Sequence, residues 1–176
     1  SEMCIRDRVG GAEKQLEKLS VVLKNNNIRS FIVTRRIKSS QKRESYNGID
    51  IVRLGTKNTK IWAILSLMFL IKNKNSFDIL HIHGLDIQAL VGCLFKLITG
   101  KPVIIKTRNV GKHVRESDFS FTNKIRMKFL NTFIDCFVAI NKEIENNLIK
   151  MEVNEKKIDL ISNGTEIVNV NSRRTK

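Results

Sequence analysis

Short apolar runs alternate with helix-patterned segments along the chain, and this alternation constrains the fold more than any other feature. The runs are rich in Ile, Val, Phe and Leu and lie at residues 29–34, 49–54, 77–83, 103–105, 136–140 and 158–161. Apolar residues recur at helical spacing near residues 11–24, 61–71, 85–97, 121–133 and 142–150. Strands separated by helices specify a parallel sheet covered on both faces. The sequence therefore predicts one α/β domain of this architecture.

Three glycine-bearing segments stand where strands and helices meet. Residues 78–84 (DILHIHG) form a buried strand that ends in a histidine and a glycine. Residues 10–13 (GGAE) open the first helix, and residues 162–164 (SNG) follow the last strand. In open α/β sheets, ligands bind outside the carboxyl ends of the strands. We therefore expect the three segments to converge on a cleft for a sugar or a nucleotide.

The start of the chain indicates that its first strand is missing. Residues 1–8 (SEMCIRDR) resemble the translation of a sequencing adapter, so we exclude them from the domain. A glycine pair that opens a helix should follow a strand, but only adapter-like sequence precedes Val9. In doubly wound folds the first strand is central. We therefore expect a Rossmann-like sheet that lacks its middle strand.

The chain is strongly basic, with 32 Lys and Arg against 17 Asp and Glu and a net charge of +15. Such a charge favours an anionic partner: nucleic acid, an anionic membrane face or a phosphorylated substrate. AT-rich codon bias is an alternative origin, because Lys, Asn and Ile are all abundant. The apolar run at residues 61–71 is too short to span a bilayer, and it predicts a core helix or a helix lying on a membrane. Three cysteines without metal or redox spacing fit a reducing, cytoplasmic compartment.

Six motifs in this order resemble a known family. They are GGAE at 10–13, GIDIVRL at 48–54, DILHIHG at 78–84, KPVII at 101–105, AINKEI at 139–144 and ISNGT at 161–165. Over residues 9–167 the chain resembles the amino-terminal domain of family 4 glycosyltransferases, which are retaining enzymes of the two-domain GT-B fold. Residues 168–176 would then begin the linker to a second domain, with Asn163 and Gly164 at the interdomain turn.

The resemblance implies transfer of a sugar from a nucleotide-sugar donor to a saccharide or lipid-linked acceptor, with retention and without a bound metal or other cofactor. It also implies that this half holds mainly the acceptor, and that a fragment without the other half is inactive. The charge then favours peripheral contact with the inner face of an anionic membrane, and the basic segment at residues 35–43 is one candidate surface.

Several residues are candidates for the site. Gly10 and Gly11 lack Cβ, so donor phosphates could approach the backbone N–H groups at the helix start. His83 is the catalytic candidate, because a histidine near the sheet edge can bond a sugar hydroxyl or assist proton movement. A structural histidine bonded to a neighbouring carbonyl is the alternative. His81 points to the same face but lies farther from the edge.

The loop after the 103–105 strand supplies the acceptor candidates Lys106, Arg108, Asn109 and Gly111. The basic pair could neutralise phosphate, or it could be exposed and solvated. Many family members place a histidine at this strand end, whereas this chain has Thr-Arg-Asn at 107–109.

Two other classes of protein compete with the transferase. A nicotinamide-dependent oxidoreductase or a sugar-nucleotide epimerase shares the strand–helix alternation, but the Gly-x-Gly-x-x-Gly fingerprint is absent here. A basic nucleic-acid-binding module would show stacking aromatics, a zinc site or a basic recognition helix, and only 6% of the residues are aromatic. We therefore expect no nucleic-acid partner.

Overall fold

The computed structural model describes residues 11–36, 41–46, 48–55, 58–107 and 121–164. Its α-helices are α1 (Gly11–Asn25), α2 (Thr59–Lys72), α3 (Ile87–Thr99), α4 (Phe121–Phe133) and α5 (Lys142–Lys150). Its strands are β1 (Phe31–Arg35), β2 (Arg43–Tyr46), β3 (Ile49–Leu54), β4 (Leu80–His83), β5 (Val103–Lys106), β6 (Cys136–Ala139) and β7 (Ile158–Leu160). Two 3₁₀ turns, Lys74–Ser76 and Glu155–Lys157, precede β4 and β7.

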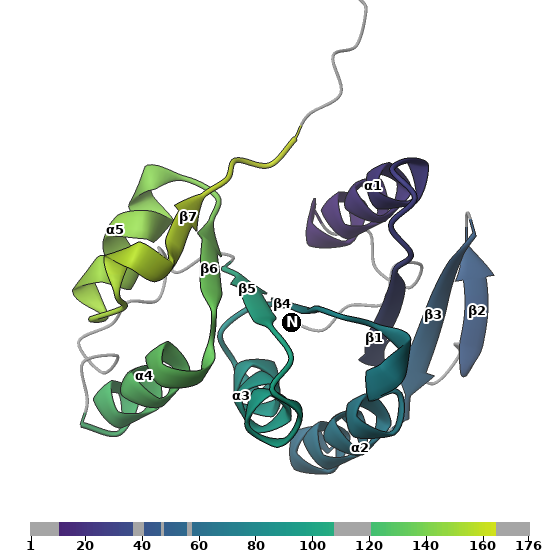
Figure 1. Ribbon diagram of the computed structural model, residues 1–176, viewed down its shortest axis with the longest axis horizontal. Helices are drawn as coiled ribbons and strands as arrows, with labels where there is room; N and C mark the ends of the chain where they lie inside the picture. The colour runs from purple at the N-terminus through teal and green to yellow at the C-terminus, as the bar shows by residue number, and fades with distance from the viewer. Residues whose placement is uncertain (1–10, 37–40, 47, 56–57, 108–120, 165–176) are drawn as a thin grey trace, which may run out of the picture.

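The strands form two sheets. One has the order β1-β3-β2, and the other has the order β4-β5-β6-β7 with all neighbours parallel. Helices α2, α3 and α4 lie on one side of the strands and α1 and α5 on the other (Figure 1). The predicted α/β, Rossmann-like arrangement is thus confirmed. Within the described residues β1 and β4 belong to different sheets, and the loss of a middle strand stays a prediction.

One element was not predicted. The sequence indicates a polar loop up to the turn at residues 47–48, but Arg43–Tyr46 forms β2, which pairs antiparallel with β3. The sheet is therefore mixed at this edge rather than wholly parallel. Arg53 of β3 holds β2 in place, because its Nη1 lies 2.8 Å from Glu44 Oε2 and also donates to the Gln41 carbonyl at 3.3 Å.

Local sequence signals account for the helix ends. Asn58 caps α2 by accepting hydrogen bonds from the N–H groups of Lys60 and Ile61, at 2.9 and 3.3 Å. Asn141, predicted as an N-cap, accepts from the Ile144 N–H at 2.9 Å at the start of α5. Gly100 ends α3 with φ of +72°, as its predicted C-cap role requires.

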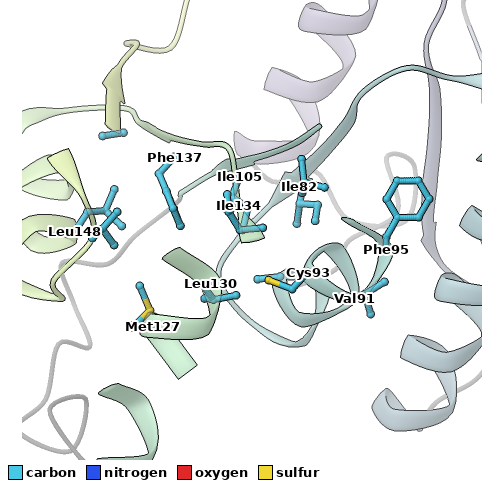
Figure 2. Packing of buried hydrophobic residues seen from close by; sticks show 14 of the residues in the cluster. Ile82, Val91, Cys93, Phe95, Ile105, Met127, Leu130, Ile134, Phe137 and Leu148 are labelled. Carbon is cyan, nitrogen blue, oxygen red and sulfur yellow. The ribbon is translucent and has the colours of Figure 1, made fainter. Parts of the chain in front are cut away.

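The main core lies between the β4–β7 sheet and its helices. Ile82 and Ile105 project from the sheet toward α3, where Cys93 and Phe95 are fully buried (Figure 2). Val103 also faces α3, beside Gly92. The spacing between helix and sheet is small, because Gly92 of α3 faces the side chain of Ile82.

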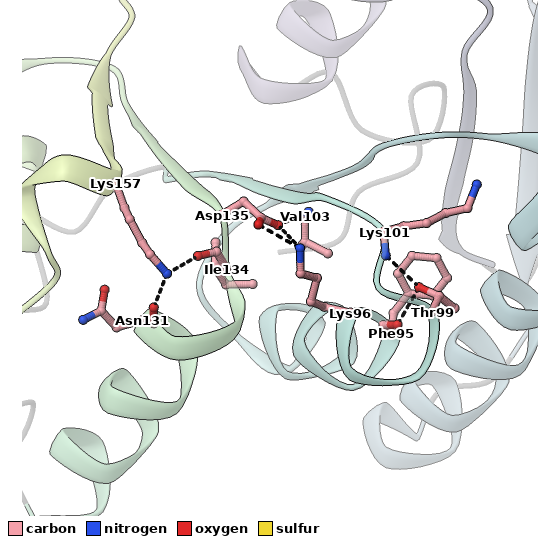
Figure 3. Close-up of polar contacts among 9 residues, drawn as sticks. All are labelled: Phe95, Lys96, Thr99, Lys101, Val103, Asn131, Ile134, Asp135 and Lys157. Carbon is pink, nitrogen blue, oxygen red and sulfur yellow. Dashed lines mark hydrogen bonds and ion pairs between the residues drawn. The ribbon is translucent and has the colours of Figure 1, made fainter.

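A polar network ties α3 to the sheet that it covers (Figure 3). Asp135 accepts from Lys96 Nζ at 2.8 Å and from the Val103 N–H at 2.8 Å. Lys157 Nζ donates to the Ile134 carbonyl at 2.9 Å, which fixes the start of β7 against the end of α4. These contacts hold the strands in the register that brings their carboxyl ends to one rim.

Candidate functional site

The candidate site lies at the carboxyl ends of β4 and β5. Beyond His83 the chain turns at Gly84, which is buried and has φ of +106°. The Gly84 N–H donates to the Lys106 carbonyl at 2.9 Å, so the loop after β4 follows the end of β5. A positive φ of this kind favours glycine, which explains why a glycine ends the histidine motif.

Two histidines and a lysine share one side of this rim. The rings of His81 and His83 stack with centroids 4.7 Å apart, which confirms that both point to the same face. His83 is paired in register with Lys106 of β5. Burial, and the positive charge of Lys106 as the smaller cause, lower the pKa of His81, although part of its side chain is exposed. Burial also lowers the pKa of Lys106. His81 is therefore a neutral imidazole at neutral pH.

Thr107 has a structural role. It is fully buried, and both its N–H and its Oγ1 donate to the Val138 carbonyl at 2.9 Å. The residue after Lys106 therefore joins β5 to β6 instead of entering the cleft. The other acceptor candidates, Arg108, Asn109 and Gly111, lie outside the described residues.

The two ends of the domain meet near the same rim. Helix α1 begins at Gly11, whereas Gly10 lies outside the described residues. Gln15 Nε2 donates to the Gly164 carbonyl at 3.2 Å across 149 residues of sequence. The predicted interdomain turn at Asn163 and Gly164 therefore lies beside the first turns of α1. Asn163 Oδ1 is buried, and no described residue donates a hydrogen bond to it.

Gln88 is a site residue that the sequence reasoning missed. Its Nε2 donates to the His83 carbonyl at 3.2 Å, and its Oε1 is buried without a donor among the described residues. A Cβ at Gly84 would lie 2.9 Å from this Nε2, so Gln88 also depends on the glycine. One feature of the sequence could have indicated Gln88: it is the one polar side chain between Asp86 and Lys96, in a helix that is otherwise apolar there.

The described residues hold no group of three or more His, Cys, Asp or Glu side chains placed to bind a metal ion. Among the described residues, the thiols of Cys93 and Cys136 are protonated at neutral pH. Burial raises the pKa of Cys93 to about 11, and burial together with Asp159 raises the pKa of Cys136 to about 11. Within the described ranges, no helix has the length and apolar character needed to cross a bilayer.

An open pocket of about 440 Å³ lies elsewhere, at the starts of β1 and β3. Phe31, Asp50 and Asn73 are among its lining residues. Because Phe31 and Asp50 stand at the amino ends of parallel strands, this pocket faces away from the rim that carries His83. We do not assign it to the candidate site.

Comparison with known proteins identifies relatives of this fold. Residues 9–168 match the profile of Glycosyltransferase Family 4. Anabaena HepE in complex with UDP and glucose aligns with a TM-score of 0.68 at 15% identity, over 91% of this chain and 42% of HepE. A sucrose-phosphate synthase from Thermosynechococcus elongatus aligns with a TM-score of 0.65 at 13% identity, over 86% of this chain and 84% of that one. A search of curated protein sequences finds no significant match.

These findings favour the transferase over the oxidoreductase, epimerase and nucleic-acid-binding alternatives. They also confirm the predicted relation to one half of a GT-B fold. The chain spans less than half the length of HepE.

Proposed function

Because the chain belongs to glycosyltransferase family 4, we propose that the whole protein transfers a sugar from a nucleotide-sugar donor to a saccharide or lipid-linked acceptor. One observation carries the assignment of the site to the rim. His83 and Lys106 stand side by side at the ends of β4 and β5, on the same face. An imidazole beside a cation suits a hydroxyl acceptor that carries or approaches phosphate.

The donor is proposed on two grounds. HepE has been solved with UDP and with UDP-glucose, and its fold resembles this chain. Gly11 begins α1 and Gly10 precedes it in the sequence, and backbone N–H groups and the helix dipole at a helix start favour a diphosphate. The link between Gln15 and Gly164 supports a turn at Asn163 and Gly164 toward a second domain that would complete the donor site.

On the acceptor side, His83 is the proposed catalytic residue. It would hydrogen-bond the reacting hydroxyl or accept its proton. Gln88 would position His83, because its Nε2 donates a hydrogen bond to the His83 carbonyl. Lys106, with Arg108, Asn109 and Gly111 beyond it, would bind the acceptor.

We further propose that the reaction retains the anomeric configuration and needs no bound metal. Lys106 can supply positive charge near phosphate without a cation. Dialysis against EDTA should leave the transfer rate unchanged, and the anomeric proton coupling of the product should match that of the donor. A loss of activity that Mg²⁺ restores would contradict the metal-free proposal.

A lipid-linked acceptor would place the protein at the inner face of the membrane. The net charge of +15 supports contact with anionic lipid there. Part of the candidate basic segment at residues 35–43 lies outside the described residues.

The test is transfer of radiolabel from a panel of UDP-sugars to soluble saccharides and to extracted membrane lipids, using the whole protein. We expect His83→Ala to lower kcat by about 100-fold, within the range for a lost general acid–base group. Lys106→Gln should chiefly raise KM for a phosphorylated acceptor. Lys150→Gln, on the exposed side of α5, is the control. Epimerised free nucleotide-sugar as the sole product would overturn the proposal.

A further inference from the structure

Helix α2 presents an apolar face to solvent. One side of it is buried: Trp62, Ser66 and Leu70 are buried, and Ala63, Leu67 and Ile71 pack against the main core. The remaining stripe is exposed, with Ile64 at 59% and Met68 at 62%, together with Ile61 and Leu65. A globular helix ordinarily turns charged residues outward at such positions.

Helix α3 continues this surface. It lies beside α2 on the same side of the strands, and it exposes Leu94, Leu97 and Ile98 (Figure 1). These residues occupy one stripe at helical spacing, and Val91 and Phe95 fill the side toward the core. The apolar face therefore extends over two adjacent helices, which is more than the scattered exposed apolar residues of an ordinary surface.

The helices on this side of the sheet carry only basic charges. Helices α2, α3 and α4 contain no Asp or Glu, and their basic residues are Lys60, Lys72, Lys96, Lys124, Arg126 and Lys128. On the other side, α1 and α5 mix basic residues with Glu13, Glu17, Glu143 and Glu145. Asp135 pairs with Lys96. Lys60, Lys72 and Lys128 are exposed.

We propose that the exposed surface of α2 and α3, flanked by these lysines, docks the protein onto an anionic lipid bilayer. Ile61, Ile64, Leu65, Met68, Leu94, Leu97 and Ile98 make up this docking face. An apolar stripe on two helices that contain lysines and no acidic residue complements the interface between acyl chains and anionic headgroups. An acidic protein would complement the lysines but not the apolar stripe between them.

This inference rests on the membrane partner proposed above but not on the transfer chemistry. It also replaces residues 35–43 as the main contact, because the docking face joins apolar area to charge. The bilayer would lie against the α2 and α3 side, whereas His81 and His83 alternate with Ile82 along β4 and therefore point to the opposite face of the sheet.

The first test is flotation of the full chain with vesicles of phosphatidylcholine, with or without phosphatidylglycerol. We expect binding that prefers phosphatidylglycerol and weakens in high salt. Lys60→Gln and Lys72→Gln should each weaken binding about fivefold, at the usual contribution of a basic residue near an anionic surface. Ile64→Ser with Met68→Ser should weaken it about tenfold or more. The matched controls on the other side are Lys150→Gln and Val22→Ser.

The second test places a fluorophore. Met68→Trp and Val22→Trp are exposed sites on opposite sides, and the sole natural tryptophan, Trp62, is 5% exposed. Brominated lipid should quench the fluorescence of the tryptophan introduced in Met68→Trp, because that residue would lie in the bilayer. It should not quench the tryptophan introduced in Val22→Trp. Quenching of both or of neither would overturn the proposal.

Other outcomes also decide the matter. A dimer that Met68→Ser dissociates, without vesicle binding, would assign the face to a second copy and overturn the proposal. Vesicle binding that survives the face variants would assign it to another surface and overturn it too. Vesicle binding without transfer to any acceptor would leave the docking face intact and contradict the proposed function alone.

Discussion

The imidazole rings of His81 and His83 stack 4.7 Å apart with their planes inclined by 29°, and His83 pairs in register with Lys106. The stack places two titratable rings beside a lysine whose own pKa burial lowers. Protonation of His81 is opposed first by burial and then by the charge of Lys106. Its titration therefore reports on the electrostatics of the candidate site.

Lys106→Gln should raise the pKa of His81, because the substitution removes a positive charge. The pKa should stay below the ordinary value of 6.5, since burial is the larger cause of the shift. An NMR titration of the histidine Hε1 resonances measures this, with Lys150→Gln as the control. An unchanged pKa in Lys106→Gln would show that the lysine does not act on His81.

Stability should depend on pH through the same residue. The folded-state pKa of His81 lies below 6.5, so the unfolded chain takes up a proton first as the pH falls. Above pH 6.5 His81 is neutral in both states and does not lower the free energy of unfolding. As the pH falls from 6.5 toward the folded-state pKa, protonation of the unfolded chain lowers that free energy. Urea midpoints compared at about pH 7.5 and about pH 5.5 should fall less in His81→Asn than in the parent chain.

Asp135→Asn should destabilise the domain by about 1–2 kcal/mol, because the ion pair with Lys96 is lost and the Val103 N–H keeps only a neutral acceptor. Burial alone would raise the pKa of Asp135, but the hydrogen bonds from Lys96 and Val103 outweigh it and lower the pKa. Asp135 therefore stabilises the folded domain above pH 3.8, and this stabilisation is lost as the pH falls below that value.

The control is Asp78→Asn. Asp78 also faces a lysine, Lys101, but at 3.9 Å and with its side chain fully exposed. Urea unfolding should detect no change there. Equal losses in the two variants would show that the network of Figure 3 adds nothing to stability.

Much of the fold could be predicted because its signals are local. Strand-length apolar runs and the caps at Asn141 and Gly100 depend on residues close in sequence, and the structure confirms both caps. Strand β2 was missed because Arg43–Tyr46 is polar and covers only four residues. Its stability comes from pairing with β3 and from the contact between Arg53 and Glu44, neither of which a local pattern reveals.

The candidate site was predicted only in outline. The histidine motif places His81 and His83 on one face because strand geometry alternates, and the stacked rings confirm it. Gln88 and the Gln15 contact with Gly164 depend on distant backbone carbonyls, so spacing in the sequence could not identify them. The run at 61–71 predicted a core helix or a helix lying on a membrane. One side of α2 is buried and the other is exposed, and an apolar run without charges could not show which side meets the core.

Glu44→Ala should cost about 3 kcal/mol, because it leaves Arg53 as a buried charge without its carboxylate. Only 1% of the Arg53 side chain is exposed, although its bond to the Gln41 carbonyl survives the change. The double variant Arg53→Met with Glu44→Leu should be close to the parent chain in stability, since it removes both charges. Chemical denaturation compares the three proteins. A double variant less stable than Glu44→Ala would show that the pair is itself strongly stabilising.

Gly92→Ala should destabilise the domain by about 1 kcal/mol, because overpacking outweighs the better helix propensity of alanine. A Cβ at Gly92 would lie 2.3 Å from Ile82 Cδ1 and 3.1 Å from Val103 Cγ1, inside a core where Val103 is fully buried. Ile82→Val removes the Cδ1 atom, so Gly92→Ala should cost less in that background than in the parent chain. Thermal unfolding of the four proteins in this cycle measures the coupling. Equal costs in both backgrounds would show that Ile82 moves aside freely and that Gly92 does not set the spacing of α3 on the sheet.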